Sequence, residues 1–167
     1  DVQYYHIQND ETGRYLLRML RDAGQRGVRV RLLVDDLYAP QAELLLLGLA
    51  TSPGVEVRVY NPFATRQESL AWRFLHALPD LKRVSRRMHN KLFIADGAMA
   101  VAGGRNLGNQ YFMRDTAENF LDIDVFATGA IVPVLSSLFD SYWNSEQVMP
   151  LQALASSAHS REELSYL

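Results

Sequence analysis

The stretch R-G-V-R-V-R-L-L-V-D-D, residues 26–36, decides the class of fold. Valine and arginine alternate after its glycine, and three consecutive apolar residues then precede two aspartates. Alternation that gives way to a continuous apolar run is typical of a strand that enters the buried part of a sheet covered by helices. We therefore predict a buried strand over residues 28–34.

The segments on either side of this strand alternate between helical and extended patterns. Residues 10–23 place apolar side chains at helical spacing and end before glycines, and residues 41–50 form a second helical stretch. Extended patterns cover residues 2–7 and 55–60. Such alternation of helices and strands predicts an α/β fold.

The second half of the chain continues this alternation. Residues 90–95 and 99–102 have the pattern of two strands joined at Asp96-Gly97, a dipeptide that favours a two-residue hairpin turn. A helix over residues 70–78 precedes this hairpin. A strand over residues 121–127 and a helix over 131–143 follow it.

The composition is that of one globular domain. The chain has 167 residues, of which 48% are hydrophobic and 22% charged, and no apolar run is long enough to span a bilayer. It has no cysteine, so disulfides and thiolate metal sites are excluded. We predict an α/β sandwich with a mixed central sheet flanked by helices over residues 1–155, and a polar tail over 156–167. A first residue other than Met suggests a processed form or a piece of something longer.

The string H-N-K-L-F-I-A-D, residues 89–96, carries the chemistry. Residues two apart on a strand point the same way, so His89 and Lys91 are expected to face one pocket. A nucleophilic imidazole beside a fixed positive charge suits phosphodiester chemistry that needs no metal. Asp96 is weaker evidence, because an Asp-Gly turn needs that residue with no catalysis at all.

A glycine pair and an asparagine follow this string. Gly103 and Gly104 would let the backbone approach a phosphate closely, and the amide of Asn106 could donate hydrogen bonds to it. Taken alone, the same residues suit a plain turn between a strand and a helix. They indicate function only because they come directly behind His89 and Lys91.

These motifs resemble those of the phospholipase D superfamily, whose members carry H-x-K-x4-D followed by a glycine pair and Asn. The chain is most similar to the amino-terminal half of bacterial cardiolipin synthase-type proteins, over about residues 1–145. The resemblance implies that His89 attacks phosphorus and forms a phosphohistidine, that Lys91 binds a non-bridging oxygen, and that Asp96 supports the structure of the site. It implies no metal and no other cofactor.

A carboxylate that orients the histidine is also expected from the resemblance. In small single-motif nucleases of the family, a Glu-Asn pair at about this spacing holds the catalytic histidine, and Glu118-Asn119 follows His89 by 29 residues (118 − 89). Asp122 and Asp124 are rivals for this role, because they share a face of the next strand. Asp35 and Asp36 end the buried strand, and turn formation explains them as well as ligand binding does, so we leave them out of the predicted site.

The family mechanism needs a second histidine, which protonates the leaving alcohol and later deprotonates the acceptor. This chain has one motif histidine, so a missing second half or a symmetric homodimer would supply the other. The predicted activity is transfer of a phosphatidyl group from phosphatidylglycerol or phosphatidylethanolamine to give cardiolipin, with hydrolysis to phosphatidic acid if water is the acceptor. The alternatives are a homodimeric phosphodiesterase or endonuclease, and a non-catalytic half that serves as a scaffold.

Residues 66–87 are locally basic in a chain whose net charge is −2. Six basic residues against two acidic ones give +4: Arg66, Arg73, Lys82, Arg83, Arg86 and Arg87 against Glu68 and Asp80. The segment could meet anionic phospholipid headgroups, or it could be a solvated helix that packs Trp72 and Leu75 inward. Its composition would also suit single-stranded nucleic acid. We predict a protein peripheral to the bacterial inner membrane on its cytoplasmic side, with the membrane surface as a partner and nucleic acid disfavoured.

Overall fold

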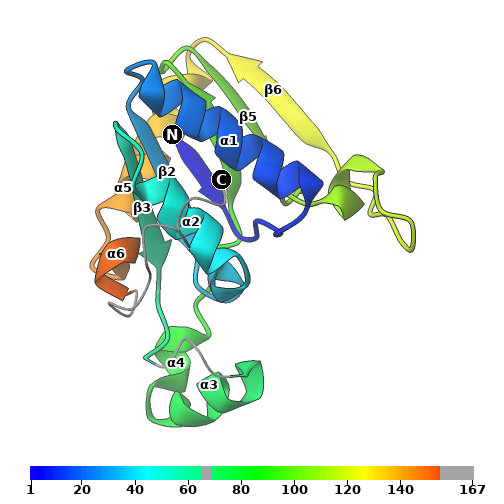
Figure 1. The fold of residues 1–167 in the computed structure, drawn as a ribbon. Helices are drawn as coiled ribbons and strands as arrows, with labels where there is room; N and C mark the ends of the chain where they lie inside the picture. Colours follow the sequence, from blue (N-terminus) through cyan, green and yellow to red (C-terminus); the bar gives the residue numbers. More distant parts are fainter. Residues whose placement is uncertain (65–68, 155–167) are drawn as a thin grey trace.

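The computed structural model describes residues 1–64 and 69–154, and within them one mixed seven-stranded sheet forms the centre of the molecule (Figure 1). The strand order is β6-β5-β4-β1-β2-β3-β7. Strands β1, β2 and β3 run parallel, whereas β4, β5, β6 and β7 each pair antiparallel to their neighbours. The strands are β1 Val2–Tyr4, β2 Val30–Asp35, β3 Val55–Tyr60, β4 Lys91–Ala95, β5 Met99–Gly103, β6 Asp124–Thr128 and β7 Val148–Pro150. The mixed sheet predicted from the sequence is confirmed.

Helices cover both faces of this sheet (Figure 1). The three longer ones are α1 Glu11–Gln25, α2 Glu43–Ala50 and α5 Ile131–Trp143. Short helices are α3 Leu70–His76, α4 Leu81–Val84 and α6 Leu151–Leu154, with 3₁₀ turns η1 Ala39–Ala42, η2 Leu78–Asp80 and η3 Asn109–Phe112. Helices α1 and α2 lie on one face and α5 on the other.

Strand β2 shows why the helices lie on opposite faces. Leu32 packs among the side chains of α1 and α2, whereas Leu33 packs with Phe139 and Trp143 of α5. Both leucines are fully buried. Successive residues of a strand point to opposite faces, so an apolar run supplies two cores at once.

The hairpin between β4 and β5 forms as predicted. Asp96 and Gly97 have φ values of 54° and 62°, and the amide of Ala98 donates to the carbonyl of Ala95 at 3.0 Å. Two left-handed residues in succession define the turn that matches the twist of paired strands. The Asp-Gly dipeptide is therefore explained by the turn alone.

Several element boundaries differ from the predicted ones; β2, for example, begins at Val30 rather than at 28, and α3 ends at His76 rather than at 78. Strand β1 ends at Tyr4, and of the three residues beyond it only Ile7 makes a bridge, a single one to Leu107. Strand β6 begins at Asp124 rather than at 121, and β7 and α6 were not predicted. The predicted tail, 156–167, lies outside the described residues. Within the described ranges, no helix is both long enough and apolar enough to cross a bilayer.

Candidate functional site

Four strand ends meet at one edge of the sheet. The register pairs Tyr4 of β1 with Val34 of β2 and with Lys91 of β4, and Leu92 of β4 with Ala102 of β5. The carboxyl ends of β1, β2 and β5 therefore lie beside the start of β4. In α/β sheets, ligands bind beyond the carboxyl ends of the parallel strands, so this edge is the candidate site.

His89 and Lys91 lie together at this edge, as the motif predicted. The Lys91 ammonium is 3.1 Å from Nδ1 of His89, and it donates to the carbonyl oxygen of His89 at 2.8 Å. His89 is exposed, whereas Lys91 is only 6% exposed. Burial lowers the pKa of Lys91 below its usual value, and the carboxylate of Asp122 opposes that shift. The exposed imidazole of His89 therefore lies next to the desolvated ammonium of Lys91.

Tyr5 forms a support for both of these side chains. Its ring centroid is 4.7 Å from that of His89, and the Lys91 ammonium lies 5.3 Å from it. Burial, together with the neighbouring Tyr38, raises the pKa of Tyr5 to about 12, so the phenol stays neutral and its ring can attract the ammonium. The sequence did not single out Tyr5, although it comes directly after a strand of the parallel group, which is a signal for ligand-facing residues.

Asp35, which we left out of the predicted site, holds the segment that leads into His89. Its carboxylate accepts from the amide of Met88 at 2.8 Å and from Nε of Arg87 at 2.9 Å. It also forms an ion pair with Arg87 at 2.7 Å and is fully buried. Burial raises the pKa of Asp35, while Arg87 and the backbone donors lower it. The residue before the histidine is therefore fixed to the end of β2.

The glycine pair makes room for carboxylates in the free site. A Cβ atom at Gly103 would lie 2.1 Å from Oδ1 of Asp124, and one at Gly104 would lie 2.0 Å from Oδ1 of Asp122. Neither distance is compatible with a side chain. Asp122 and Asp124 thus fold over the glycines beside Lys91, and the binding of phosphate by Gly103 and Gly104 stays a prediction.

Asn106 and Glu118, two further predicted site residues, differ in burial. Asn106 is buried, and its Nδ2 donates to the hydroxyl of Tyr111 at 2.9 Å, which uses one of its two amide hydrogens. Glu118 is exposed, and its carboxylate accepts from Gln110 at 3.4 Å. The structure does not bring Glu118 against His89, whose neighbours are Tyr5 and Lys91. An orienting role for Glu118 therefore stays a prediction.

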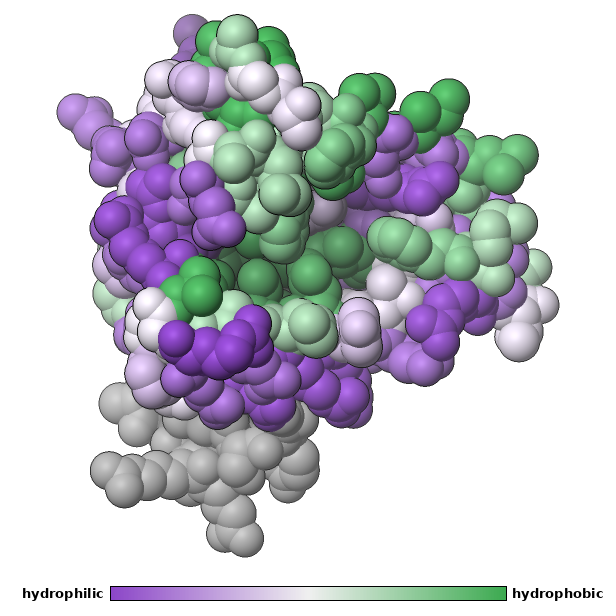
Figure 2. Space-filling view, turned by 90° about the horizontal axis from the view of Figure 1, so that it is seen from above, coloured by the Kyte–Doolittle hydropathy of each residue, from purple (hydrophilic) through white to green (hydrophobic). Residues whose placement is uncertain are grey.

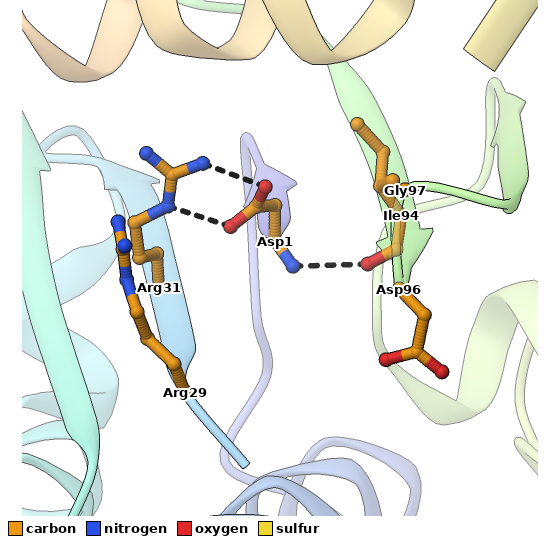
Figure 3. A pocket seen from close by; sticks show the side chains of 6 residues that line it. All are labelled: Asp1, Arg29, Arg31, Ile94, Asp96 and Gly97. Atoms are coloured by element: carbon orange, nitrogen blue, oxygen red, sulfur yellow. Dashed lines mark hydrogen bonds and ion pairs between the residues drawn. The ribbon is translucent and has the colours of Figure 1, made fainter. Parts of the chain in front are cut away.

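Asp96 lies at the opposite end of β4 from Lys91. It is exposed and borders a cavity of about 230 Å³, where its carboxylate points away from the pair formed by Asp1 and Arg31 (Figure 3). Nε of Arg31 donates to the Asp1 carboxylate at 2.6 Å, and the terminal amine donates to the carbonyl of Ile94 at 2.9 Å (Figure 3). This placement separates Asp96 from His89 and Lys91, and a supporting role for Asp96 stays a prediction.

Metal ligands are not gathered at this edge. Among the residues the structure describes, no group of three or more His, Cys, Asp or Glu side chains is arranged to hold a metal ion.

Comparison with known proteins agrees with the predicted family and fold. A family model described as cardiolipin synthase, PLD-like domain, matches residues 1–143. Cardiolipin synthase C from Escherichia coli strain K12 is 44% identical over 152 residues, which are 91% of this chain and 31% of that protein. A cardiolipin synthase from Staphylococcus aureus strain Mu50 is 30% identical over 146 residues, which are 86% of this chain and 27% of that protein. The chain therefore spans less than a third of the length of either relative.

Among solved structures, NucT from Helicobacter pylori has a similar fold. The TM-score is 0.58 with 14% sequence identity, and the match covers 89% of this chain and 79% of that one. Fold and family model together define a phospholipase D-like domain. The chain belongs to the cardiolipin synthase family of such domains, as its motifs predicted.

Proposed function

We propose that this domain supplies the attacking histidine of a metal-free phosphatidyltransferase. The observation that carries the proposal is an exposed His89 imidazole held 3.1 Å from the ammonium of a buried Lys91. A desolvated cation stabilises charge on a phosphoryl oxygen far better than a solvated one does. The similarity to cardiolipin synthases favours a phospholipid as the substrate.

The contact between Lys91 and His89 defines the resting state. We assign Nδ1 of His89 as the acceptor in this contact, because the ammonium of Lys91 can only donate. When a phosphodiester binds, the ammonium turns to a non-bridging oxygen and releases the imidazole. An unprotonated ring nitrogen of His89 then attacks phosphorus, the bond from phosphorus to the headgroup oxygen breaks, and the alcohol leaves with a proton from a second histidine.

The second step reverses the first with a new alcohol. A hydroxyl group of a second phosphatidylglycerol gives its proton to the second histidine and attacks the phosphorus, which breaks the bond to His89 and forms cardiolipin. Water in place of this alcohol gives phosphatidic acid. Tyr5 and Asp35 act as positioning residues, because they contact His89, Lys91 and Met88 rather than the substrate.

The second histidine comes from a second phospholipase D-like half or a second copy. Supporting this, exposed apolar side chains flank Asp122 on the loop into the edge strand β6, with Leu121 at 92% and Ile123 at 78% exposed. Apolar side chains as exposed as these mark interaction sites. Docking on Leu121 and Ile123 would bring the partner close to Lys91, which lies within electrostatic reach of Asp122. Figure 2 shows the opposite end of the sheet, where hydrophobic side chains gather around the centre of the molecule.

The test is incubation of the protein with labelled phosphatidylglycerol vesicles and a chelator, beside His89→Ala. We expect labelled cardiolipin, and an acid-labile labelled adduct on the peptide that contains His89, both absent from the variant. Phosphatidic acid alone would narrow the activity to hydrolysis. Cleavage of DNA with untouched lipid would favour the endonuclease alternative. Full turnover by His89→Ala in the complete protein would establish the scaffold alternative.

If the isolated chain forms no labelled product, the same assay is run with the remainder of the native protein supplied. Absence of product in that second assay contradicts the proposal. Size-exclusion chromatography of Leu121→Asp and Ile123→Asp tests the pairing separately. If the partner docks on this surface, these variants should no longer form the paired species.

A further inference from the structure

Helix α3 has its apolar side chains on the outside. Trp72 and Leu75 are 55% and 50% exposed, and the buried residue of this helix is Arg73. A helix of a water-soluble protein normally presents the reverse pattern. The alternative in which Trp72 and Leu75 pack inward is therefore wrong. The exposed apolar residues continue through η2 into α4, and the set is Leu70, Trp72, Leu75, Leu78 and Leu81.

The inward side of this element is anchored by polar contacts. Arg73 donates to the carbonyl and carboxylate of Asp36 at 2.8 and 3.1 Å, and its guanidinium lies 4.3 Å from the ring centroid of Phe63. Nη1 of Arg83 donates to Oδ1 of Asn61, whose amide in turn donates to the Arg83 carbonyl at 2.9 Å. These bonds attach the element firmly to the ends of β2 and β3. The exposed leucines and Trp72 are thus not needed to hold it in place.

The element protrudes, and it leads directly to the nucleophile. Helices α3 and α4 extend beyond the sheet, away from α1, α2 and α5 (Figure 1). Helix α4 ends at Val84, five residues before His89, and Val84 and Met88 are both buried. Whatever contacts this protruding surface is therefore brought beside the candidate site.

The charge of the element is opposite to that of the whole chain. Residues 69–88 hold five basic residues and one acidic residue, whereas the chain carries a net charge of −2. Lys82 and Arg86 are exposed next to the leucines, and Asp80 is paired with Arg83. Trp, Leu and basic side chains together on a convex surface match the boundary of an anionic bilayer, where apolar groups enter the acyl region and cations meet phosphate.

We propose that the α3–α4 element, residues 69–86, is a membrane-docking surface for bilayers that contain anionic phospholipid. The inference rests on the proposed function in one respect, since the docked orientation presents lipid headgroups to His89. The element enters the headgroup region through Trp72, Leu75 and Leu78, while Lys82 and Arg86 lie over the phosphates. Docking on a membrane explains why the apolar residues of this element face outward and why arginines hold its inward side.

The experiment measures binding of the chain to vesicles, without turnover. Co-sedimentation with phosphatidylglycerol–phosphatidylcholine vesicles is compared with phosphatidylcholine alone. Trp72→Glu/Leu75→Glu is expected to lower the partition coefficient roughly tenfold or more, given the cost of losing buried apolar area. The matched control is Tyr15→Glu/Met19→Glu, which changes two exposed apolar residues of α1 and should bind as the unmutated chain does.

Charge is tested in the same way. Lys82→Glu/Arg86→Glu should weaken binding to anionic vesicles roughly tenfold or more, since basic residues near the membrane surface are attracted to the anionic headgroups. Arg18→Glu/Arg26→Glu has the same change of net charge on exposed residues of α1 and its cap, and should have little effect. Raising the salt concentration should weaken vesicle binding by the unmutated chain and abolish the difference in binding between the two charge variants.

Tryptophan fluorescence gives an independent readout. The chain has two tryptophans, and Trp143 is only 4% exposed, so a blue shift on adding vesicles reports Trp72. Binding that is equal in all variants, or no binding by the folded unmutated chain, would overturn the proposal. Loss of self-association in Trp72→Glu/Leu75→Glu without vesicle binding would assign the surface to a protein partner instead. Vesicle binding without any turnover would leave this inference standing and count against the proposed function alone.

Discussion

The two ends of strand β4 carry residues of the same motif to opposite edges of the sheet. At its start, Lys91 is buried against Tyr5 and beside His89. At its end, Asp96 is exposed in a hairpin turn. The desolvated charge of Lys91 at one end lowers stability but suits stabilisation of a phosphoryl oxygen. Asp96 at the other end is required by the turn itself. A motif that is contiguous in sequence therefore contains residues with unrelated tasks.

The largest effect is expected at the buried end. Lys91→Met should lower turnover roughly 10²- to 10³-fold, as the loss of one group that stabilises transition-state charge does. It should leave the melting temperature unchanged or raise it by about 2–4 °C, because a desolvated charge is replaced by an apolar chain of similar length. Kinetics and calorimetry on the complete protein measure both. Lys82→Met, at the other lysine of the chain, is the stability control.

The sign of the pH dependence sharpens this prediction. Since burial lowers the pKa of Lys91 from 10.5, turnover should fall on the alkaline side before a free lysine would lose its proton. Between the folded and the unfolded pKa, the unfolded chain binds a proton that the folded one lacks, so the free energy of unfolding should rise with pH there. That contribution should vanish in Lys91→Met. A melting temperature that drops by several degrees in this variant would contradict the account of Lys91 as a strained charge.

A second effect concerns the support beneath His89. Both carboxylate oxygens of Asp35 accept from donors, so in Asp35→Asn the amide nitrogen must face a donor in either orientation. We expect a loss of about 1–3 kcal/mol in unfolding free energy, the cost of an unsatisfied buried group, and weaker turnover. Denaturant melts of this variant and of Glu56→Gln, which changes an ion pair half exposed at the surface, compare a buried pair with an exposed one. Equal losses would remove Asp35 from the site.

Gly104 tests whether the glycine pair makes room for a carboxylate. Gly104→Ala should destabilise the protein by about 1–3 kcal/mol, because its Cβ overlaps the carboxylate of Asp122. Combining it with Asp122→Gly should recover much of that loss in a double-mutant cycle. If the two changes are additive instead, the glycine is required for another reason, such as the approach of substrate.

The smallest effect is expected at Asp96. Asn tolerates a left-handed backbone, so Asp96→Asn should change stability by less than about 0.5 kcal/mol and turnover by less than about twofold. Asp96→Ala should cost about 1 kcal/mol, since alanine disfavours this backbone conformation. Thermal melts and steady-state rates decide the matter. A fall in turnover for Asp96→Asn that approaches that of Lys91→Met would break the contrast between the two ends of the strand.

Local patterns were sufficient for much of this protein. The apolar run that follows alternating Val and Arg predicted β2, and Asp96-Gly97 predicted the hairpin, because such features depend on neighbours in the chain. The spacing of the motif predicted that His89 and Lys91 face the same way, and they lie together although His89 precedes β4. The boundaries of β1 and β6 were predicted less well, since pairing with other strands decides where a strand ends.

Contacts between distant segments decided the rest. The sequence determined an α/β sheet, a hairpin and a histidine beside a lysine, because these follow from residue spacing, and its motifs carried the resemblance to the phospholipase D superfamily. Only the tertiary structure placed Tyr5 under the pair, attached Asp35 to Met88, brought Asp122 and Asp124 over the glycines and turned Trp72 outward. Each of these depends on which strands lie side by side and on which surfaces remain uncovered, and no pattern within a single segment encodes that.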